Sequence, residues 1–260
     1  SETVFNDGSA DKDFRVESNA NANRFKIDGG DDVVVMGTGT VEDSIYGAKP
    51  ALQLTGTDFN SSAFSIIRNA ADASSPNLIF GKSRSADGNT VVQNGDDLGN
   101  ITFAAADGTD QNNTAARIYA EIDGTPGAND TPGRLVFATT ADGANSATER
   151  LRINNSGKIG IGTTSQARLL HLSSADNQIA RFESTDAYGG IEICDNSSGT
   201  AKPLISALGN DFIFYRGGSS HAEAFRVTSG GVGIGTTSPS ANLHVDSSGG
   251  GVIRVSRNSS

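Results

Sequence analysis

One unit occurs twice in this sequence, and the repetition restricts what the chain can fold into. The run Ile159-Gly160-Ile161-Gly162-Thr163-Thr164-Ser165 returns 73 residues later as Val232-Gly233-Ile234-Gly235-Thr236-Thr237-Ser238. At the same offset, Leu170-His171-Leu172 returns as Leu243-His244-Val245. A weaker third copy runs from Phe25-Lys26-Ile27 to Leu52-Gln53-Leu54. Such internal repetition is typical of chains built from stacked supersecondary units.

The repeated motifs have the alternation of strands. In Leu151-Arg152-Ile153 and Phe225-Arg226-Val227, an apolar residue stands on each side of a basic one, so that apolar and basic side chains face opposite sides of a pleat. Ile and Val together outnumber Leu, and seven Asp-Gly or Asn-Gly pairs separate the apolar runs, which favours hairpins. The sequence therefore predicts an all-β fold of hairpins and meanders.

The apolar content is low for a chain that must cover its strands unaided. Leu, Ile, Val and Phe make up about 22% of the 260 residues, close to the roughly 20% below which chains tend to remain disordered. Two and a half copies of a unit of some 70 residues are too few for a self-sufficient solenoid. We therefore expect identical chains to cover one face of each strand, which makes the protein a homo-oligomer.

Charge and cysteine content exclude several classes of partner and site. The formal net charge is −10, which disfavours nucleic acid and anionic membrane surfaces as partners. No apolar run approaches 18 residues, so membrane insertion is not expected. The single cysteine, Cys194, cannot form an internal disulfide, and no Cys/His cluster offers a zinc site. No cofactor is expected.

The chain divides by composition into four segments. Residues 1–50 and the two repeat copies at 149–223 and 224–260 read as units of short strands, the last one truncated. Residues 51–148 read as a β-rich globular domain inserted between them. Its expected strands lie at 62–68, 77–81, 100–105, 116–122 and 133–139.

The glycine pairs of the repeat do not match a nucleotide-binding loop. A dinucleotide fingerprint needs a third glycine that opens a helix, and a P-loop needs Gly-Lys-Ser/Thr; neither is present. Glycines at alternate positions instead permit a close backbone approach, as near an oligomer axis, or a sharp bend. His171 and His244 occupy equivalent places, either as hydrogen-bonded imidazoles or as a ring of histidines on an axis that binds a metal or an anion.

Glu121 and Asp123 are the only paired carboxylates that invite a catalytic interpretation. They flank Ile122 and share a strand face, with their Cα atoms about 6.6 Å apart. Glycoside hydrolysis uses paired carboxylates at separations of roughly 5 to 9 Å. The chain has no Trp to stack sugars, so a solvated acidic face is the favoured interpretation.

The other polar candidates have simpler explanations. Asp31-Asp32 and Asp96-Asp97 lack the spacing of a calcium loop and read as turn residues. His221 reads as a loop residue, and Cys194 as a small residue without a neighbouring base. The sequence thus predicts no catalytic, cofactor-binding or metal-binding residue.

The repeat strings, read together, resemble tail fibres and tailspike-like appendages of tailed bacteriophages. The resemblance rests on Arg152-Ile153, the Gly160-Ile161-Gly162-Thr163-Thr164-Ser165 string with its copy, and the Leu-His-Leu/Val triplets. Segments such as Pro132-Gly133-Arg134-Leu135-Val136-Phe137 look like parts of the same fibres. The resemblance implies an elongated, intertwined homotrimeric β fibre in the phage virion. Many relatives end in an intramolecular chaperone of the endosialidase type, which we do not expect within residues 1–260.

The function implied by this resemblance is structural and adhesive, without catalysis. The expected partners are two further copies of the chain, other tail or baseplate proteins, and a glycan or protein of the host surface. Exposed loops of residues 51–148 would carry any recognition. Two alternatives stay open: a tailspike polysaccharide depolymerase, and a bacterial surface adhesin of prophage origin.

Overall fold

The computed structural model describes residues 14–18, 21–28, 30–37, 49–197, 200–218 and 221–246. Over these residues the chain is all-β: it has three sheets and no helix, as the sequence predicts. It divides into two compact units, residues 1–175 and 176–260. The described part of the chain accordingly holds no helix that is long and apolar enough to cross a membrane.

The first sheet has four strands in chain order. Strands β1, β2 and β3 are antiparallel neighbours, whereas β4 pairs with β3 in parallel. Its strands are β1 (Phe14–Ser18), β2 (Asn21–Asp28), β3 (Val33–Gly37) and β4 (Leu52–Thr55).

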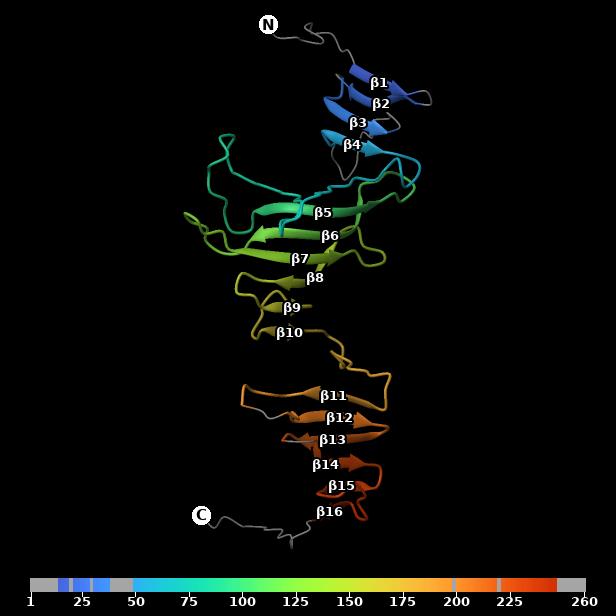
Figure 1. Cartoon of the computed structure of the whole chain (residues 1–260), viewed down its shortest axis with the longest axis vertical. Helices are drawn as coiled ribbons and strands as arrows, with labels where there is room; N and C mark the ends of the chain where they lie inside the picture. The colour runs from blue at the N-terminus through green and yellow to red at the C-terminus, as the bar shows by residue number, and fades with distance from the viewer. Residues whose placement is uncertain are drawn as a thin grey trace. The chain divides into compact units, whose positions relative to one another are not determined.

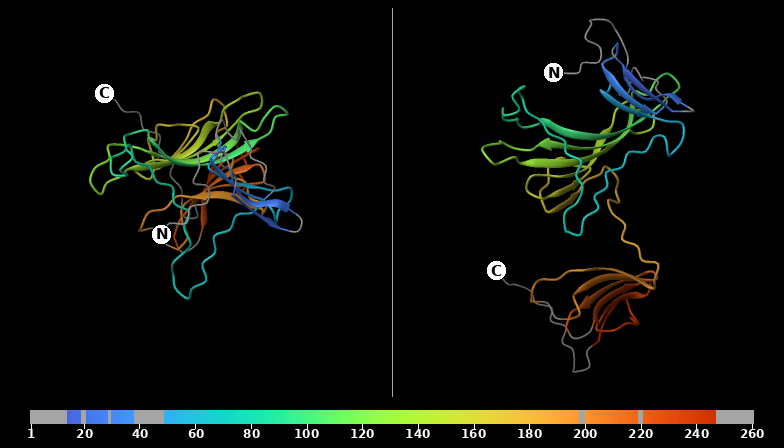
Figure 2. Two further views of the ribbon diagram at one scale, coloured as in Figure 1. Left: turned by 90° about the horizontal axis from the view of Figure 1, so that it is seen from above. Right: turned by 45° about the horizontal axis from the view of Figure 1, so that its top comes forward.

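The second sheet has six strands, again in chain order. Five of them form an antiparallel meander, and the sixth pairs with the fifth in parallel (Figure 1). They form a single curved layer, visible in both views of Figure 2. Its strands are β5 (Asp97–Ala105), β6 (Asn113–Ile122), β7 (Gly133–Thr139), β8 (Thr148–Ile153), β9 (Ile159–Ile161) and β10 (Leu170–Leu172).

The third sheet repeats this plan. It is also a five-stranded antiparallel meander that closes with a parallel pair, β15 with β16. Its strands are β11 (Tyr188–Glu192), β12 (Leu204–Leu208), β13 (Asp211–Arg216), β14 (Ala222–Thr228), β15 (Gly231–Ile234) and β16 (Leu243–Val245).

Two glycines explain how a loop of eight residues can join parallel strands, which usually need a crossover of a dozen residues or more. Gly162 leaves β9 with φ +70°, and a Cβ there would lie 2.1 Å from the carbonyl oxygen of Ser173. A Cβ on Gly160 would lie 2.5 Å from the carbonyl oxygen of Thr163, because the loop folds back over the strand. Both expected roles of the glycines, sharp bend and close approach, therefore occur within one chain.

In both six-stranded sheets a β-bulge lies in the strand before the strand that carries the glycine pair, in β8 before β9 and in β14 before β15. In β8 the pairing with β7 skips Arg150, and in β14 the pairing with β13 skips Ala224. The carbonyl oxygens of these two bulge residues accept hydrogen bonds from Gly162 N (3.0 Å) and Gly235 N (3.3 Å). Through these hydrogen bonds, the bulges of β8 and β14 contact the bends at Gly162 and Gly235, where the loops begin.

Two of the predicted strands are wrong for the isolated chain. Residues 62–68 and 77–81 belong to no sheet, because no strand in the described part of the chain pairs with them. The other three, at 100–105, 116–122 and 133–139, lie in β5, β6 and β7. These continue directly into β8, so the division expected between residues 148 and 149 falls inside one sheet.

The buried core of each sheet is small. Val136 in β7 and Ile213 in β13 are fully covered, as are Val35 in β3 and Ile122 at the end of β6. Over thirty large apolar side chains in the described residues remain exposed. The single chain therefore covers few of its own apolar side chains.

Candidate functional site

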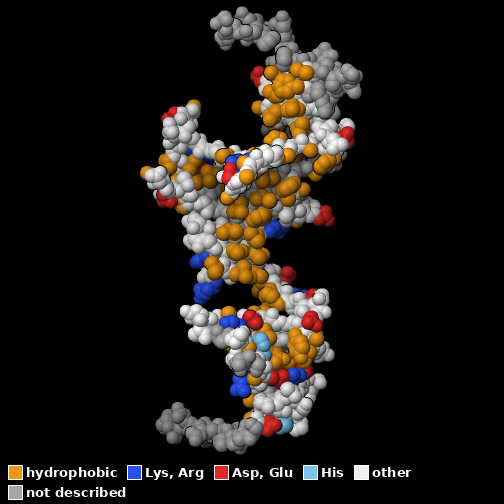
Figure 3. Space-filling view, viewed as in Figure 1, with side chains coloured by type: hydrophobic (Ala, Val, Ile, Leu, Met, Phe, Trp, Pro, Cys, Tyr) orange, Lys and Arg blue, Asp and Glu red, His pale blue; other side chains and the backbone are white. Residues whose placement is uncertain are grey.

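One face of the β5–β10 sheet carries two unbroken rows of apolar residues. The strand register aligns one residue of each strand in each row, and none of the twelve is buried. Figure 3 shows hydrophobic side chains, in orange, gathered over these strands. The rows are Ile101, Ile118, Phe137, Leu151, Ile161, Leu172 and Gly99, Ala120, Leu135, Ile153, Ile159, Leu170.

The β11–β16 sheet carries the same two rows with nearly the same residues, and again none is buried. Two edge-to-face ring pairs lie in them, Phe212 with Phe214 (5.0 Å between centroids) and Phe214 with Phe225 (5.4 Å). The rows are Ile191, Ile205, Phe214, Phe225, Ile234, Val245 and Gly189, Ala207, Phe212, Val227, Val232, Leu243.

The four-stranded sheet follows the same pattern over its described side chains. The register aligns Val16, Phe25, Met36 and Leu54 in one row, and Ile27, Val34 and Leu52 in the other. The first sheet therefore matches the last four strands of the six-stranded unit. We call these aligned rows the apolar face of each sheet.

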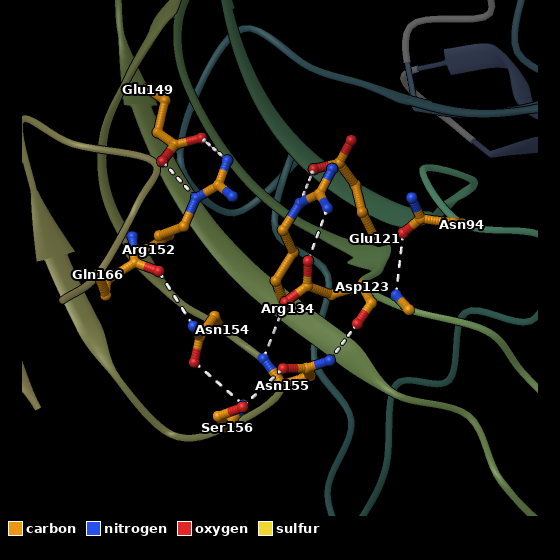
Figure 4. A network of polar contacts seen from close by, with 11 residues as sticks. Asn94, Glu121, Asp123, Arg134, Glu149, Arg152, Asn154, Asn155, Ser156 and Gln166 are labelled. Carbon is orange, nitrogen blue, oxygen red and sulfur yellow. Dashed lines mark hydrogen bonds and ion pairs between the residues drawn. The ribbon is translucent and has the colours of Figure 1, made fainter. Parts of the chain in front are cut away.

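The opposite face holds an arginine network in both six-stranded sheets. Arg152 donates two hydrogen bonds to Glu149, Nε to Oε1 and Nη2 to Oε2, both 2.6 Å (Figure 4). Residues three apart on a regular strand point to opposite faces, so this pair depends on the bulge at Arg150. Arg226 pairs with Glu223 across the bulge at Ala224 in the same manner.

Glu121 and Asp123 contact one arginine rather than solvent alone. Arg134 Nε donates to Glu121 Oε2 (2.7 Å), and its Nη1 donates to Asp123 Oδ1 (3.0 Å), as Figure 4 shows. Burial opposes ionisation of Asp123, but hydrogen bonds from Asn155 N–H and Arg134 outweigh it and lower the pKa of Asp123. A general acid for glycoside hydrolysis needs a raised pKa. The arrangement suits an ion-paired structural carboxylate, and the solvated face expected from the sequence is in fact half-buried.

At one position the two six-stranded sheets carry side chains of opposite charge. Asp211 begins β13 where Arg134 stands in β7, and it accepts a hydrogen bond from Arg226 Nη1 (2.7 Å). The hydrogen bonds of Arg226 with Glu223 and with Asp211, of which the first has the larger effect, raise the pKa of Arg226 above its ordinary value. Each sheet thus satisfies its polar face with a different set of ion pairs.

The two histidines face their own loops. His171 Nδ1 lies 2.9 Å from the carbonyl oxygen of Ser165 and 3.4 Å from Ala167 N, and His244 Nδ1 lies 3.3 Å from Ser240 N. Gln53 holds the matching place in the first sheet, and its Nε2 donates to Pro50 O (3.4 Å). In all three copies, a polar side chain opposite the central residue of the preceding strand therefore bonds to a described residue of the connecting loop.

The structure places the other candidates apart from one another. Asp31 and Asp32 lie in the turn before β3, where Asp28 Oδ1 accepts hydrogen bonds from Gly30 N and Asp31 N. Asp96 pairs with Arg84 and ends a turn, and Cys194 and His221 lie in loops. Within the described ranges, no group of three His, Cys, Asp or Glu side chains could hold a metal ion.

Sequence reasoning found the repeat in the last three strands of each unit and missed the first three. The signal for them was present: Leu135-Val136-Phe137 resembles Phe212-Ile213-Phe214, and Gly99-Asn100-Ile101 resembles Gly189-Gly190-Ile191. Loops of different length separate these strings, so no single offset aligns them.

The solved structures that are similar to this chain include two of a bacteriophage tail fibre. The carboxy-terminal domain of the bacteriophage T5 L-shaped tail fibre has a TM-score of 0.37 and 11% identity, and the match covers 74% of this chain and all of that one. The same domain with its intramolecular chaperone has a TM-score of 0.34 and 11% identity, covering 75% and 69%. At TM-scores below 0.5, these likenesses fix neither fold nor function. No protein-family model and no curated protein matches the chain.

Proposed function

We propose that this chain is a structural segment of a phage tail fibre, assembles as a homotrimer and helps attach the virion to the host surface without catalysis. The sequence resemblance supports the identity of the fibre and the number three. One structural observation carries the self-association: an open apolar face that is repeated position by position in two sheets.

The energy available at this face supports assembly. Covering a half-exposed Ile, Leu, Val or Phe side chain contributes about 1 kcal/mol, so the ten large positions of one sheet contribute on the order of 10 kcal/mol. Association costs roughly 4–15 kcal/mol in lost translational and rotational freedom. The free energy gained by covering the apolar face of one sheet is close to the cost of association, and the gain from two repeated sheets exceeds that cost.

The repetition also favours copies of the same chain over an unrelated partner. A partner that covers both apolar faces in the same way must itself present the matching surface twice. A second copy of this chain meets that requirement, since it carries the same rows twice.

The recognition and tail partners follow from the fibre proposal. Long exposed loops between residues 56 and 147 suit contact with a host glycan or protein, because loops on a rigid scaffold tolerate variation. Other tail or baseplate proteins would bind the segment at its ends. The low pKa of Asp123 supports a non-catalytic role for the carboxylate pair.

Native mass spectrometry tests the assembly. We expect a species of about 80 kDa, three times the 26.7 kDa of one chain. A stable monomer at micromolar concentration contradicts the proposal.

Antibody labelling and an activity assay test the role. Antibodies against the chain should decorate tail fibres of phage particles and block adsorption, whereas labelling of cells that carry no particles supports the adhesin alternative. Release of reducing ends from host capsule, abolished by Glu121→Ala, would establish the depolymerase alternative instead.

A further inference from the structure

The connection from β4 to β5 contains two segments outside the sheets whose backbone has no hydrogen-bond partner among the described residues. No other described residue donates to or accepts from the backbone of residues 63–67 or 78–81. The turns around them are well satisfied: Ser61 N donates to Asp58 Oδ1 (2.8 Å), and Asn89 N donates to Asp87 Oδ1 (3.0 Å). Residues 63–67 and 78–81 therefore lack the backbone hydrogen bonds that these turns have.

The side chains of the same segments are apolar and uncovered. Phe64, Ile67 and Ile79 expose 73%, 76% and 82% of their surface, and Phe59, just before them, exposes 84%. Their sequence is typical of strands, with Phe64 alternating with Ile66 and Leu78 with Phe80. A β-prone apolar segment with an unpaired backbone is a strand that lacks its neighbour.

The connection before β11 has the same character. Ile179 and Phe182 are exposed, and no described residue bonds to the backbone of residues 178–182. Both connections also pass the same place in the unit: a Cβ on Gly99 would lie 2.5 Å from Phe80 Cβ, and one on Gly189 would lie 3.6 Å from Ser184 N. These glycines hold equivalent positions in the second apolar row.

We propose that residues 62–68 and 77–81 form strands by pairing with the backbone of a neighbouring copy of this chain. The pairing partner is a second copy of this chain because a segment with an unpaired backbone occurs in both repeated units. Its partner must therefore also offer the matching backbone twice, and a second copy does so. Each copy offers suitable backbone at the open edges of its sheets, of which β5 is nine residues long. This inference rests on the self-association in the proposed function and names the segments that make inter-chain hydrogen bonds.

Hydrogen exchange on the assembled 260-residue chain tests the pairing. We expect the alternate amides of residues 64–67 and 78–81 that face the partner strand to exchange at least 100-fold more slowly than those of the exposed turn at residues 85–89. Dilution to monomer should abolish the protection.

A matched pair of proline variants provides the second measurement. Ser65→Pro removes an N–H from the proposed strand. It should raise the protein concentration at which half of the oligomer dissociates to monomer at least tenfold. Ala86→Pro is the control, because Ala86 is the second residue of a turn closed by Gly88 N and Ser85 O, where proline is favoured. It should leave assembly unchanged.

The outcomes separate this inference from the proposed function. An oligomer whose amides at 64–67 and 78–81 exchange freely overturns the strand pairing and leaves the apolar-face assembly standing. A chain that stays monomeric overturns both. The wild-type exchange measurement decides the question even where Ser65→Pro does not fold.

Discussion

The two six-stranded sheets keep the same apolar rows, whereas the spacing of their strands along the chain and part of the ion pairs on the opposite face differ. From β5 to β11 the offset between matching residues is 90, and by β9 and β15 it has fallen to 73, because the β11–β16 sheet begins with shorter strands and has shorter connections after β12. The ion pairs on the opposite face also change, with Asp211 in place of Arg134. The two sheets share the apolar face that their own chain leaves open, together with the bend glycine and the Arg–Glu pair across the bulge.

The largest expected effect comes from placing a charge in the apolar row of either sheet. Ile161→Asp and Ile234→Asp occupy matching positions, and each buries three carboxylates in a trimer without partners. We expect each to weaken assembly at least 100-fold, measured by sedimentation across a dilution series. The control is Thr164→Asp in the exposed loop after β9, which should assemble normally. Unequal effects of the two row variants would show that the sheets are covered differently.

Alanine at the bend glycine should destabilise both sheets alike. Gly162→Ala and Gly235→Ala combine a positive φ with a Cβ about 2 Å from a carbonyl oxygen, so we expect a loss of about 3 kcal/mol or more in unfolding free energy. Gly157→Ala is the matched control, with φ +73° and open space at the Cβ position, and should lose about 1 kcal/mol. Denaturant unfolding at one fixed protein concentration measures the difference. Equal losses at positions 157 and 162 would contradict the close approach.

The different ion pairs should make Arg226 of the β11–β16 sheet more important for stability than Arg152 of the β5–β10 sheet. Arg226→Met leaves Glu223 and Asp211 unpaired, whereas Arg152→Met leaves only Glu149. Since these groups are partly exposed, we expect losses of about 2 and about 1 kcal/mol respectively. The same unfolding experiment compares them. A larger loss for Arg152→Met would contradict this account.

The smallest effect is an acid sensitivity that belongs to the first six-stranded sheet. The folded pKa of Asp123 is lowered, so its contribution is fully present above the ordinary value near 3.8 and is lost as pH falls below it. Asp123→Asn should cost about 1 kcal/mol or less at pH 7 and flatten the decline of stability between about pH 5 and pH 2. The exposed Asp142→Asn serves as control. An unchanged acid slope in Asp123→Asn would show that other carboxylates dominate.

Much of the local structure was predictable because it depends on neighbouring residues. Alternation predicted the triplet strands, and the glycine pairs predicted a bend or a close approach, which Gly162 and Gly160 provide. The contacts of Glu121 and Asp123 with Arg134 were not predictable, because the arginine comes from the next strand and reaches them only through the register. The same holds for Glu149 and Arg152, which share a face only because of a bulge.

The sequence by itself determined that this chain is all-β, that its strands have one apolar side, and that a glycine unit recurs. Only the tertiary structure decided that the recurring unit has six strands, that it closes with a parallel pair, and that its apolar residues align into two rows that the chain itself leaves uncovered. The physical reason is that alternation is a local property of the backbone, whereas a row exists only once strands separated by loops of unequal length are hydrogen-bonded in register.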